Sequence, residues 1–77
     1  MDGLKVREYL IRLKCADKSI SQRWLVRQLR RNGFSTLWEP QFTNILDGLK
    51  TANSDMVLDT AIKLLKKEAD RLNIKLN

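Results

Sequence analysis

The sequence predicts an all-α protein that forms a single domain. The chain has 77 residues with only one proline and three glycines, and strong helix formers dominate it. Apolar residues recur at spacings of three and four, and no stretch of useful length alternates apolar and polar residues as a strand does. We therefore expect one helical domain over residues 1–77, with an ordered core at about residues 4–72.

The first helix is predicted over residues 4–16, and residues 17–18 form the break after it. Within this range four apolar or aromatic residues are expected to face the core, namely Val6, Tyr9, Leu10 and Leu13.

The second helix is predicted to begin at Ser19 or Ser21 and to continue to about residue 32. Either serine can accept a hydrogen bond from a free amide at the helix start, and Ser19 with Gln22 fits a capping box. Gly33 then supplies the left-handed stop that is common at helix C-termini.

The third helix is predicted to be short, about eight to eleven residues, and to end at Gly48. Two patterns place its start differently. Thr36 with Glu39 fits a capping box and favours a start at residue 37. Pro40 belongs in a first helical turn and favours a start at Pro40 itself.

The last helix is predicted over residues 55–72, capped by Asn53 or Ser54. Its apolar stripe contains Val57, Ala61, Leu64, Leu65 and Leu72, with Leu58 at the edge. Acidic residues near its start and basic residues near its end suit the helix dipole. Residues 73–77 are expected to fray.

The charge of the chain favours an anionic partner. Fifteen Lys and Arg against nine Asp and Glu give a net charge of +6 and a pI near 9.9, which suits nucleic acid, an acidic membrane or an acidic protein. No apolar run approaches the ~20 residues of a membrane span, and the N-terminus lacks a signal-peptide core. We therefore expect a cytoplasmic protein without a membrane partner.

The residue types argue against an enzyme. The chain has no His, a single Cys, no Gly-rich phosphate loop and no nucleophile–base pair. We expect no catalysis, no cofactor, no metal and no small-molecule substrate. Cys15 is expected to be a small core residue in a reducing compartment.

The third predicted helix has two different faces. Trp38, Phe42, Ile45 and Leu46 fall within about 100° of arc and are expected to anchor the helix in the core. The other face carries Pro40, Gln41, Thr43, Asn44 and Asp47. Gln and Asn can pair with adenine edges, and Thr can reach a phosphate, so this face suits a DNA major groove. A plain solvated surface helix is the alternative.

The second predicted helix carries basic residues opposite its buried side, which Leu25 and Leu29 mark. Its arginines, Arg23, Arg27, Arg30 and Arg31, cluster within about 100° of arc, and no acid occurs between Lys18 and Glu39. This cluster is either a phosphate-binding patch or a solvated face. Trp24, at its edge, is expected in the core rather than stacked on a ligand.

Two segments carry a resemblance to a known family. "ISQRWLVRQL" resembles the start of the helix-turn-helix in lambda-repressor/Cro-like DNA-binding domains, and "FTNILDG" resembles the end of their recognition helix. The resemblance implies a compact four-to-five-helix bundle and a bacterial, phage or mobile-element regulator. One departure stands out: Leu29 and Phe42 are about six residues further apart than the family's tight turn allows.

The resemblance also implies roles for individual residues. Gln22 would contact a phosphate at a helix N-terminus, Thr43 would face the DNA backbone, and Lys50 would meet the next phosphate. The residues facing the groove would be Glu39, Pro40, Gln41 and Asn44. Independently of the resemblance, the arginine cluster makes Arg23 and Arg27 candidates for further phosphate contacts.

Two functions from different classes follow. The first is a sequence-specific double-stranded DNA-binding transcriptional regulator such as a repressor, acting as a homodimer on a palindrome; the last helix would serve as dimer contact or as bundle core. The alternative is a small protein-interaction module, an anti-repressor or inhibitor, on the same scaffold.

Overall fold

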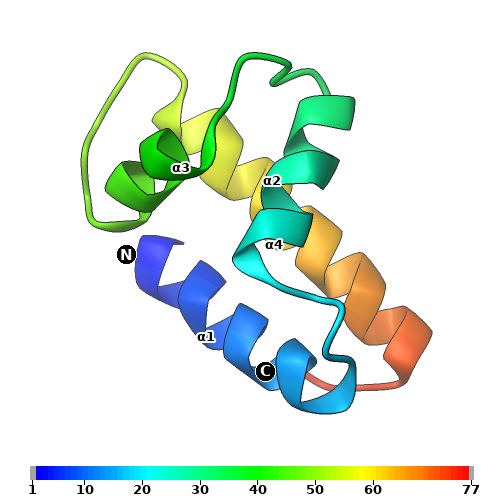
Figure 1. Ribbon diagram of the computed structural model, residues 1–77. Helices are drawn as coiled ribbons and strands as arrows, with labels where there is room; N and C mark the ends of the chain where they lie inside the picture. The colour runs from blue at the N-terminus through cyan, green and yellow to red at the C-terminus, as the bar shows by residue number, and fades with distance from the viewer. Residues whose placement is uncertain (1, 77) are drawn as a thin grey trace.

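In the computed structural model, which describes residues 2–76 and the side chains of residues 3–76, the protein consists of four helices and no strand (Figure 1). They are α1 (Asp2–Ala16), α2 (Gln22–Arg31), α3 (Glu39–Leu46) and α4 (Ser54–Leu72). The two long helices, α1 and α4, make the most extensive contact, and each also packs against α3. The prediction of an all-helical fold is confirmed. Over the described range, no helix has both the length and the apolar character needed to cross a membrane.

The start of α2 is capped by Ser21. The Ser21 hydroxyl accepts a hydrogen bond from the Trp24 N–H at 3.1 Å, which satisfies one of the free amides of the first turn. Ser19 is used differently: both its N–H and its hydroxyl donate to the Asp17 carboxylate, at 3.0 Å and 2.7 Å. Of the two predicted caps, Ser21 is therefore the correct one.

Glycines close α2 and α3 as predicted. Gly33 and Gly48 have φ values of +108° and +107°, which are favourable for residues without a Cβ. Beyond Gly33 the Phe34 N–H donates to the Leu29 carbonyl at 3.1 Å, and beyond Gly48 the Leu49 N–H donates to the Asn44 carbonyl at 2.9 Å. These bonds are those of the Schellman motif, and at both positions they turn the backbone sharply away from the helix that ends there.

The start of α3 lies between the two predicted positions, at Glu39. Trp38 precedes it in an extended conformation, and its N–H donates to the Gln41 Oε1 at 3.1 Å. Gln41 therefore caps the helix from inside. Thr36 forms no such bond with Glu39, so the predicted capping box at Thr36 is wrong, and Pro40 occupies the second helical position instead of the first.

The start of α4 is held by a loop contact in place of a side-chain cap. Ser54, expected as a cap, is the first helical residue, and its buried hydroxyl donates to the Thr51 carbonyl and accepts from the Thr51 N–H. Asn53 makes no side-chain capping bond. The contact fixes the segment between α3 and α4 instead of satisfying a helix amide.

The core contains most of the residues that helical spacing predicted. All of those predicted in α1 are buried, as are Leu25 and Leu29 of α2 and Phe42, Ile45 and Leu46 of α3. In α4 the buried set includes Val57, Leu58, Ala61 and Leu65, whereas Leu64 and Leu72 are only partly buried. Trp24 is partly buried against the core, as expected. Further core residues are Ile20, Val26, Leu37, Ala69 and Leu76.

The described part of the C-terminal tail, residues 73–76, is held against α1, contrary to the expectation that residues 73–77 fray; residue 77 lies outside the described residues. After the left-handed residue Asn73, the Ile74 N–H donates to the Ala69 carbonyl at 2.8 Å. Leu76 is 7 % exposed, and Arg12 of α1 donates to its carbonyl at 3.2 Å. These contacts continue the core past the end of α4.

The exposed face of α1 carries Cys15 and two large apolar side chains, Leu4 and Ile11. The expectation that Cys15 is a core residue is wrong, because it follows Leu13 by two residues and so lies on the opposite side of the helix.

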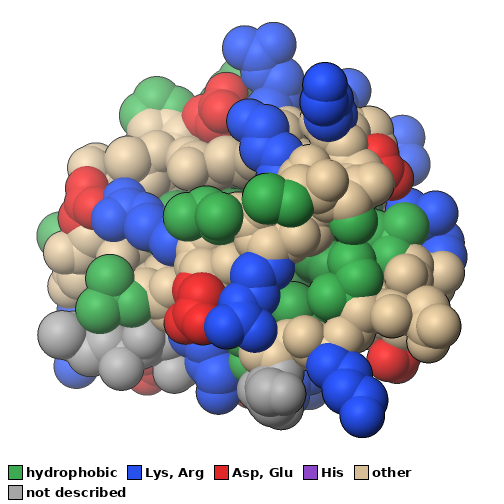
Figure 2. Space-filling model, turned by 90° about the horizontal axis from the view of Figure 1, so that it is seen from below, with side chains coloured by type: hydrophobic (Ala, Val, Ile, Leu, Met, Phe, Trp, Pro, Cys, Tyr) green, Lys and Arg blue, Asp and Glu red, His purple; other side chains and the backbone are tan. Residues whose placement is uncertain are grey.

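Figure 2 shows the molecule from below, where Lys and Arg side chains are spread among hydrophobic ones instead of gathering in one patch.

α1 and α3 meet at a glycine. Gly3 is buried, and a Cβ at this position would lie 2.3 Å from the Leu46 carbonyl oxygen. The absence of a side chain at residue 3 therefore allows the start of α1 to reach the end of α3. On the same side, Arg7 of α1 forms an ion pair with Asp47, the residue after α3.

Candidate nucleic-acid interface

α3 is attached to α2 through a side-chain hydrogen bond. The Gln22 Nε2 donates to the Thr43 Oγ1 at 2.7 Å, and the Thr43 hydroxyl in turn donates to the Glu39 carbonyl at 3.0 Å. Both side chains are partly buried. Two residues predicted to contact DNA phosphate and backbone therefore contact each other, and this bond orients α3 on α2.

A second contact between these helices is ionic. The Arg23 Nε lies 3.6 Å from the Glu39 Oε2 at the start of α3. Glu39, expected to face the groove, is directed toward α2. Both groups are substantially exposed, so the pair adds little stability, but it offsets part of the charge of Arg23.

Arg30 connects the end of α2 to the segment before α3. Its Nε donates to the Leu37 carbonyl at 2.7 Å, and its guanidinium lies 4.2 Å from the centre of the Trp38 ring. Trp38 is 61 % exposed, so the prediction that it anchors α3 in the core is wrong. The neighbouring residue Leu37 is buried in its place.

The four predicted phosphate-binding arginines therefore divide into two groups. Arg23 and Arg30 have partners on the chain, whereas Arg27 and Arg31 are exposed and form no ion pair or side-chain hydrogen bond within residues 2–76. Lys50, which follows the end of α3, is likewise exposed. Arg23 and Arg30 lie at the start of α3, and Lys50 lies beyond its end.

The outward face of α3 is nearly uncharged. Pro40, Gln41 and Asn44 are exposed, while Asp47 pairs with Arg7. The Gln41 carbonyl oxygen is occupied by the cap of α3, but its amide nitrogen donates to no group in the described structure. The Asn44 side chain makes no hydrogen bond to another described residue. Both amides can therefore donate to an external partner.

The sequence did not indicate the contact of Arg30 with Leu37 and Trp38. Helical projection treated Trp38 as part of the wheel, although it precedes the first helical turn. The sequence also carried no sign that the loop before α3 and the segment after α3 line a hollow beside Gln41. Neither feature has a local sequence pattern, since both depend on how the two loops fold back.

Comparisons with known proteins leave the family of this chain open. No protein-family model, no curated protein and no solved structure shows significant similarity to it.

Proposed function

We propose that the protein is a sequence-specific double-stranded DNA-binding regulator of transcription, with α3 lying in the major groove. In this proposal α2 and α3 form a helix-turn-helix with a long turn, in a domain similar to the lambda-repressor/Cro-like family. The observation that carries the proposal is that Gln41 and Asn44 lie exposed on a nearly uncharged face of α3, while Arg23 and Arg30 of α2 contact residues 37–39 at the start of this helix.

The proposed roles follow from which groups remain available. Arg27 and Arg31 of α2 and Lys50 after α3 have no described partner, so they suit phosphates on either side of the groove. The amides of Gln41 and Asn44 suit base edges, because a carboxamide can match the donor and acceptor of adenine. Gln22 and Thr43 position α3 instead of acting as the main phosphate ligands.

The same contacts supply preorganisation. The Gln22–Thr43 bond and the Arg23–Glu39 pair join α3 to α2 on the side away from Gln41 and Asn44. A reading helix that is fixed before binding loses less conformational freedom in the complex. Glu39 also sits next to arginine, which reduces its repulsion of phosphate.

A homodimer is part of the proposal. α3 has eight residues, and one helix of this length reads few base pairs. Two copies on a palindromic site would supply the remaining specificity.

The test is a binding assay on duplex DNA. Enrichment of a randomised duplex library should yield a preferred sequence, and fluorescence anisotropy should show affinity that falls steeply with salt. Asn44→Ala should cost about 1–3 kcal/mol at the preferred sequence and relax its choice of base. Asn53→Ala is the matched control, because Asn53 is exposed and makes no side-chain capping bond.

Gln41 needs a different substitution, since its carbonyl oxygen also caps α3. Gln41→Glu retains an acceptor for the Trp38 N–H but removes the amide donor, so the helix stays capped while base reading is lost. If Asn44→Ala and Gln41→Glu both leave sequence preference unchanged, α3 is not the reading helix.

A protein-interaction module is the second candidate, and one observation favours it. Trp38 is 61 % exposed and is stacked by Arg30, and Trp and Arg are the residue types most enriched at the centres of protein interfaces. Weak binding to every duplex, with no enriched sequence, would support this candidate over the first.

A further inference from the structure

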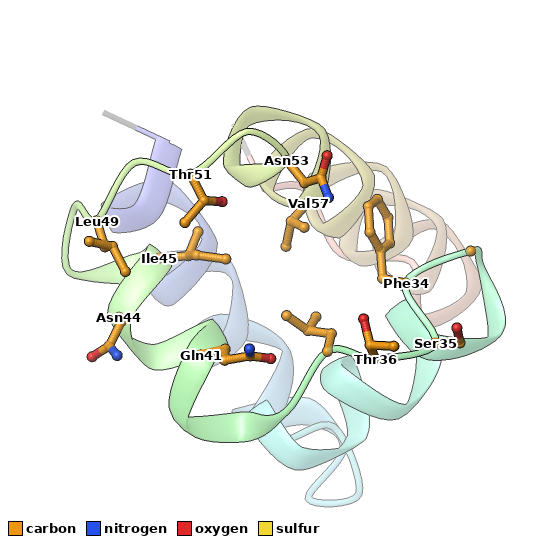
Figure 3. Close-up of a pocket in the computed structure, with 12 residues that line it drawn as sticks. Phe34, Ser35, Thr36, Gln41, Asn44, Ile45, Leu49, Thr51, Asn53 and Val57 are labelled. Atoms are coloured by element: carbon orange, nitrogen blue, oxygen red, sulfur yellow. The ribbon is translucent and has the colours of Figure 1, made fainter.

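A hollow of about 360 Å³ lies beside α3 (Figure 3). It is enclosed by α3, by the loop of residues 33–37, by the segment of residues 49–53 and by the start of α4. Its size falls within the range of about 300–1,000 Å³ that is typical of small-molecule sites. The apolar part of its lining consists of Phe34, Leu37, Ile45, Leu49 and Val57.

The lining is entirely uncharged. None of the twelve residues around the hollow is Asp, Glu, Lys or Arg, although these types make up 31 % of the chain. An ionic ligand would lose hydration here without gaining a counter-charge. The hollow therefore selects for a neutral ligand.

Hydrogen-bonding groups stand around the opening. Figure 3 shows Gln41 and Thr36 on one side and Thr51 and Asn53 on the other, whereas the Asn44 amide points away from the centre. Within the described chain, the side chains of Thr36, Thr51 and Asn53 make no hydrogen bond, and the Gln41 nitrogen is also unused. These groups can donate to, and accept from, one edge of a ligand.

We propose that this hollow binds a small, uncharged, aromatic molecule with a hydrogen-bonding edge, such as an aromatic amide or a neutral heteroaromatic ring. The ring would lie against Phe34, Leu37 and Val57, and its polar edge would face Gln41 and Asn53. A bound ligand would occupy the Gln41 donor and cover the adjacent surface of α3. Its occupancy would therefore oppose DNA binding, a consequence that rests on the proposed function.

The first experiment uses three probes of the same shape and different charge: benzamide, benzoate and benzamidinium. Nitrogen–proton NMR spectra of the full chain should show saturable shifts with benzamide at the amides of residues 33–37, 41 and 49–53. A fragment of this size should bind with a Kd of about 1–10 mM. Benzoate and benzamidinium should not shift this set. The proposal is overturned if benzamide causes no saturable shifts there, or if the charged probes bind the same site equally well.

Leu49 and Leu4 supply a matched pair of variants. Both are more than half exposed and both line a neighbouring hollow of about 460 Å³, but only Leu49 also lines the proposed site. Leu49→Ala should weaken benzamide binding about threefold to tenfold, because apolar contact is lost. Leu4→Ala should leave it unchanged. Weakening by both variants would place the probe in the neighbouring hollow and reject the proposal.

Competition with DNA is measured separately. Saturating benzamide should lower the affinity for the preferred duplex, and should do so less in the Leu49→Ala variant. If benzamide binds but no duplex is preferred, the ligand site stands and the proposed function fails. If a duplex is preferred and benzamide does not bind, the reverse holds. If both bind without competing, the regulatory consequence is rejected.

Discussion

Gln22, the first residue of α2, donates a hydrogen bond of 2.7 Å to the hydroxyl of Thr43 on α3, across 21 positions of sequence. The bond is partly buried, and the Thr43 hydroxyl itself donates a second hydrogen bond to the Glu39 carbonyl. This short relay links the N-terminus of one helix to the first turns of the next. It is one of the contacts that hold α3 against α2.

Thr43→Val should destabilise the fold by about 0.5–1.5 kcal/mol, since the substitution keeps the shape and leaves the Gln22 amide without its acceptor. Urea unfolding would measure the change. Thr36→Val is the control, because Thr36 is exposed and its hydroxyl has no partner in the described structure. Equal effects of the two substitutions would mean that the relay contributes nothing.

Arg30→Lys should lower the free energy of unfolding by about 1 kcal/mol, although the substitution conserves the charge. Lysine lacks the planar group that donates to the Leu37 carbonyl while stacking on the Trp38 ring. The same assay with Arg31→Lys, at an exposed position without a described partner, should show almost no change. Tryptophan fluorescence of Arg30→Lys should also shift, because Trp38 loses the stacked cation.

Gly3→Ala should destabilise the protein by about 1–3 kcal/mol. Replacing an ordinary glycine inside a helix by alanine stabilises the protein by about 0.5–1 kcal/mol. The sign of the change in stability is therefore diagnostic. The added methyl would meet the backbone oxygen of Leu46, which cannot move without shifting the end of α3. Thermal unfolding of Gly3→Ala and of the exposed control Lys14→Ala would decide; a stabilised Gly3→Ala would contradict the close contact.

The pKa of Asp17 is lowered from 3.8 by the hydrogen bonds from the Ser19 hydroxyl and N–H and by the contact with Arg71. A carboxylate with a depressed folded-state pKa stabilises the fold above its unfolded pKa, and this contribution is lost as the pH falls through the folded value. Stability should therefore decline as the pH falls below about 4.

Replacing Ser19 by alanine should raise the pKa of Asp17 toward 3.8, as followed by NMR of the carboxyl carbon. Asp17→Asn should make acid unfolding less steep, whereas Asp59→Asn, at an exposed site without a described ion pair, should not. An unchanged pKa in Ser19→Ala would show that the hydroxyl does not contribute, and that the N–H of residue 19 and Arg71 are responsible.

Sequence patterns were sufficient for the helices and most of the core, for a physical reason. Residues such as Val6, Leu13, Leu25 and Leu65 recur at the helical period, and burial of one face follows directly from that period. Gly33 and Gly48 marked helix ends because the left-handed closure favours a residue without a side chain. These are local properties.

The errors at Trp38 and at the C-terminal tail arose where contacts between separate segments decide, whereas the error at Cys15 did not, since its exposure follows from the helical period. Trp38 stands before the first turn in an extended conformation, so its direction is set by Arg30 and not by the helical wheel. Leu76 is buried because α1 offers it a surface that no property of the tail itself reveals. At the candidate interface, the helical wheel predicted that Gln41 and Asn44 are exposed. It did not predict the hydrogen bond between Gln22 and Thr43 or the contacts of Arg30 with residues 37–38.

The single thiol of the chain sits where a spectroscopic reporter is useful. Cys15 is twelve residues along α1 from Gly3, which touches the end of α3, and a helix of this length spans about 18 Å. A fluorophore coupled to the thiol would report the rotational tumbling of the protein and its distance from a labelled partner. It would leave α3 and the adjacent hollow unobstructed. The natural sequence thus permits labelling at one site without any preparatory substitution.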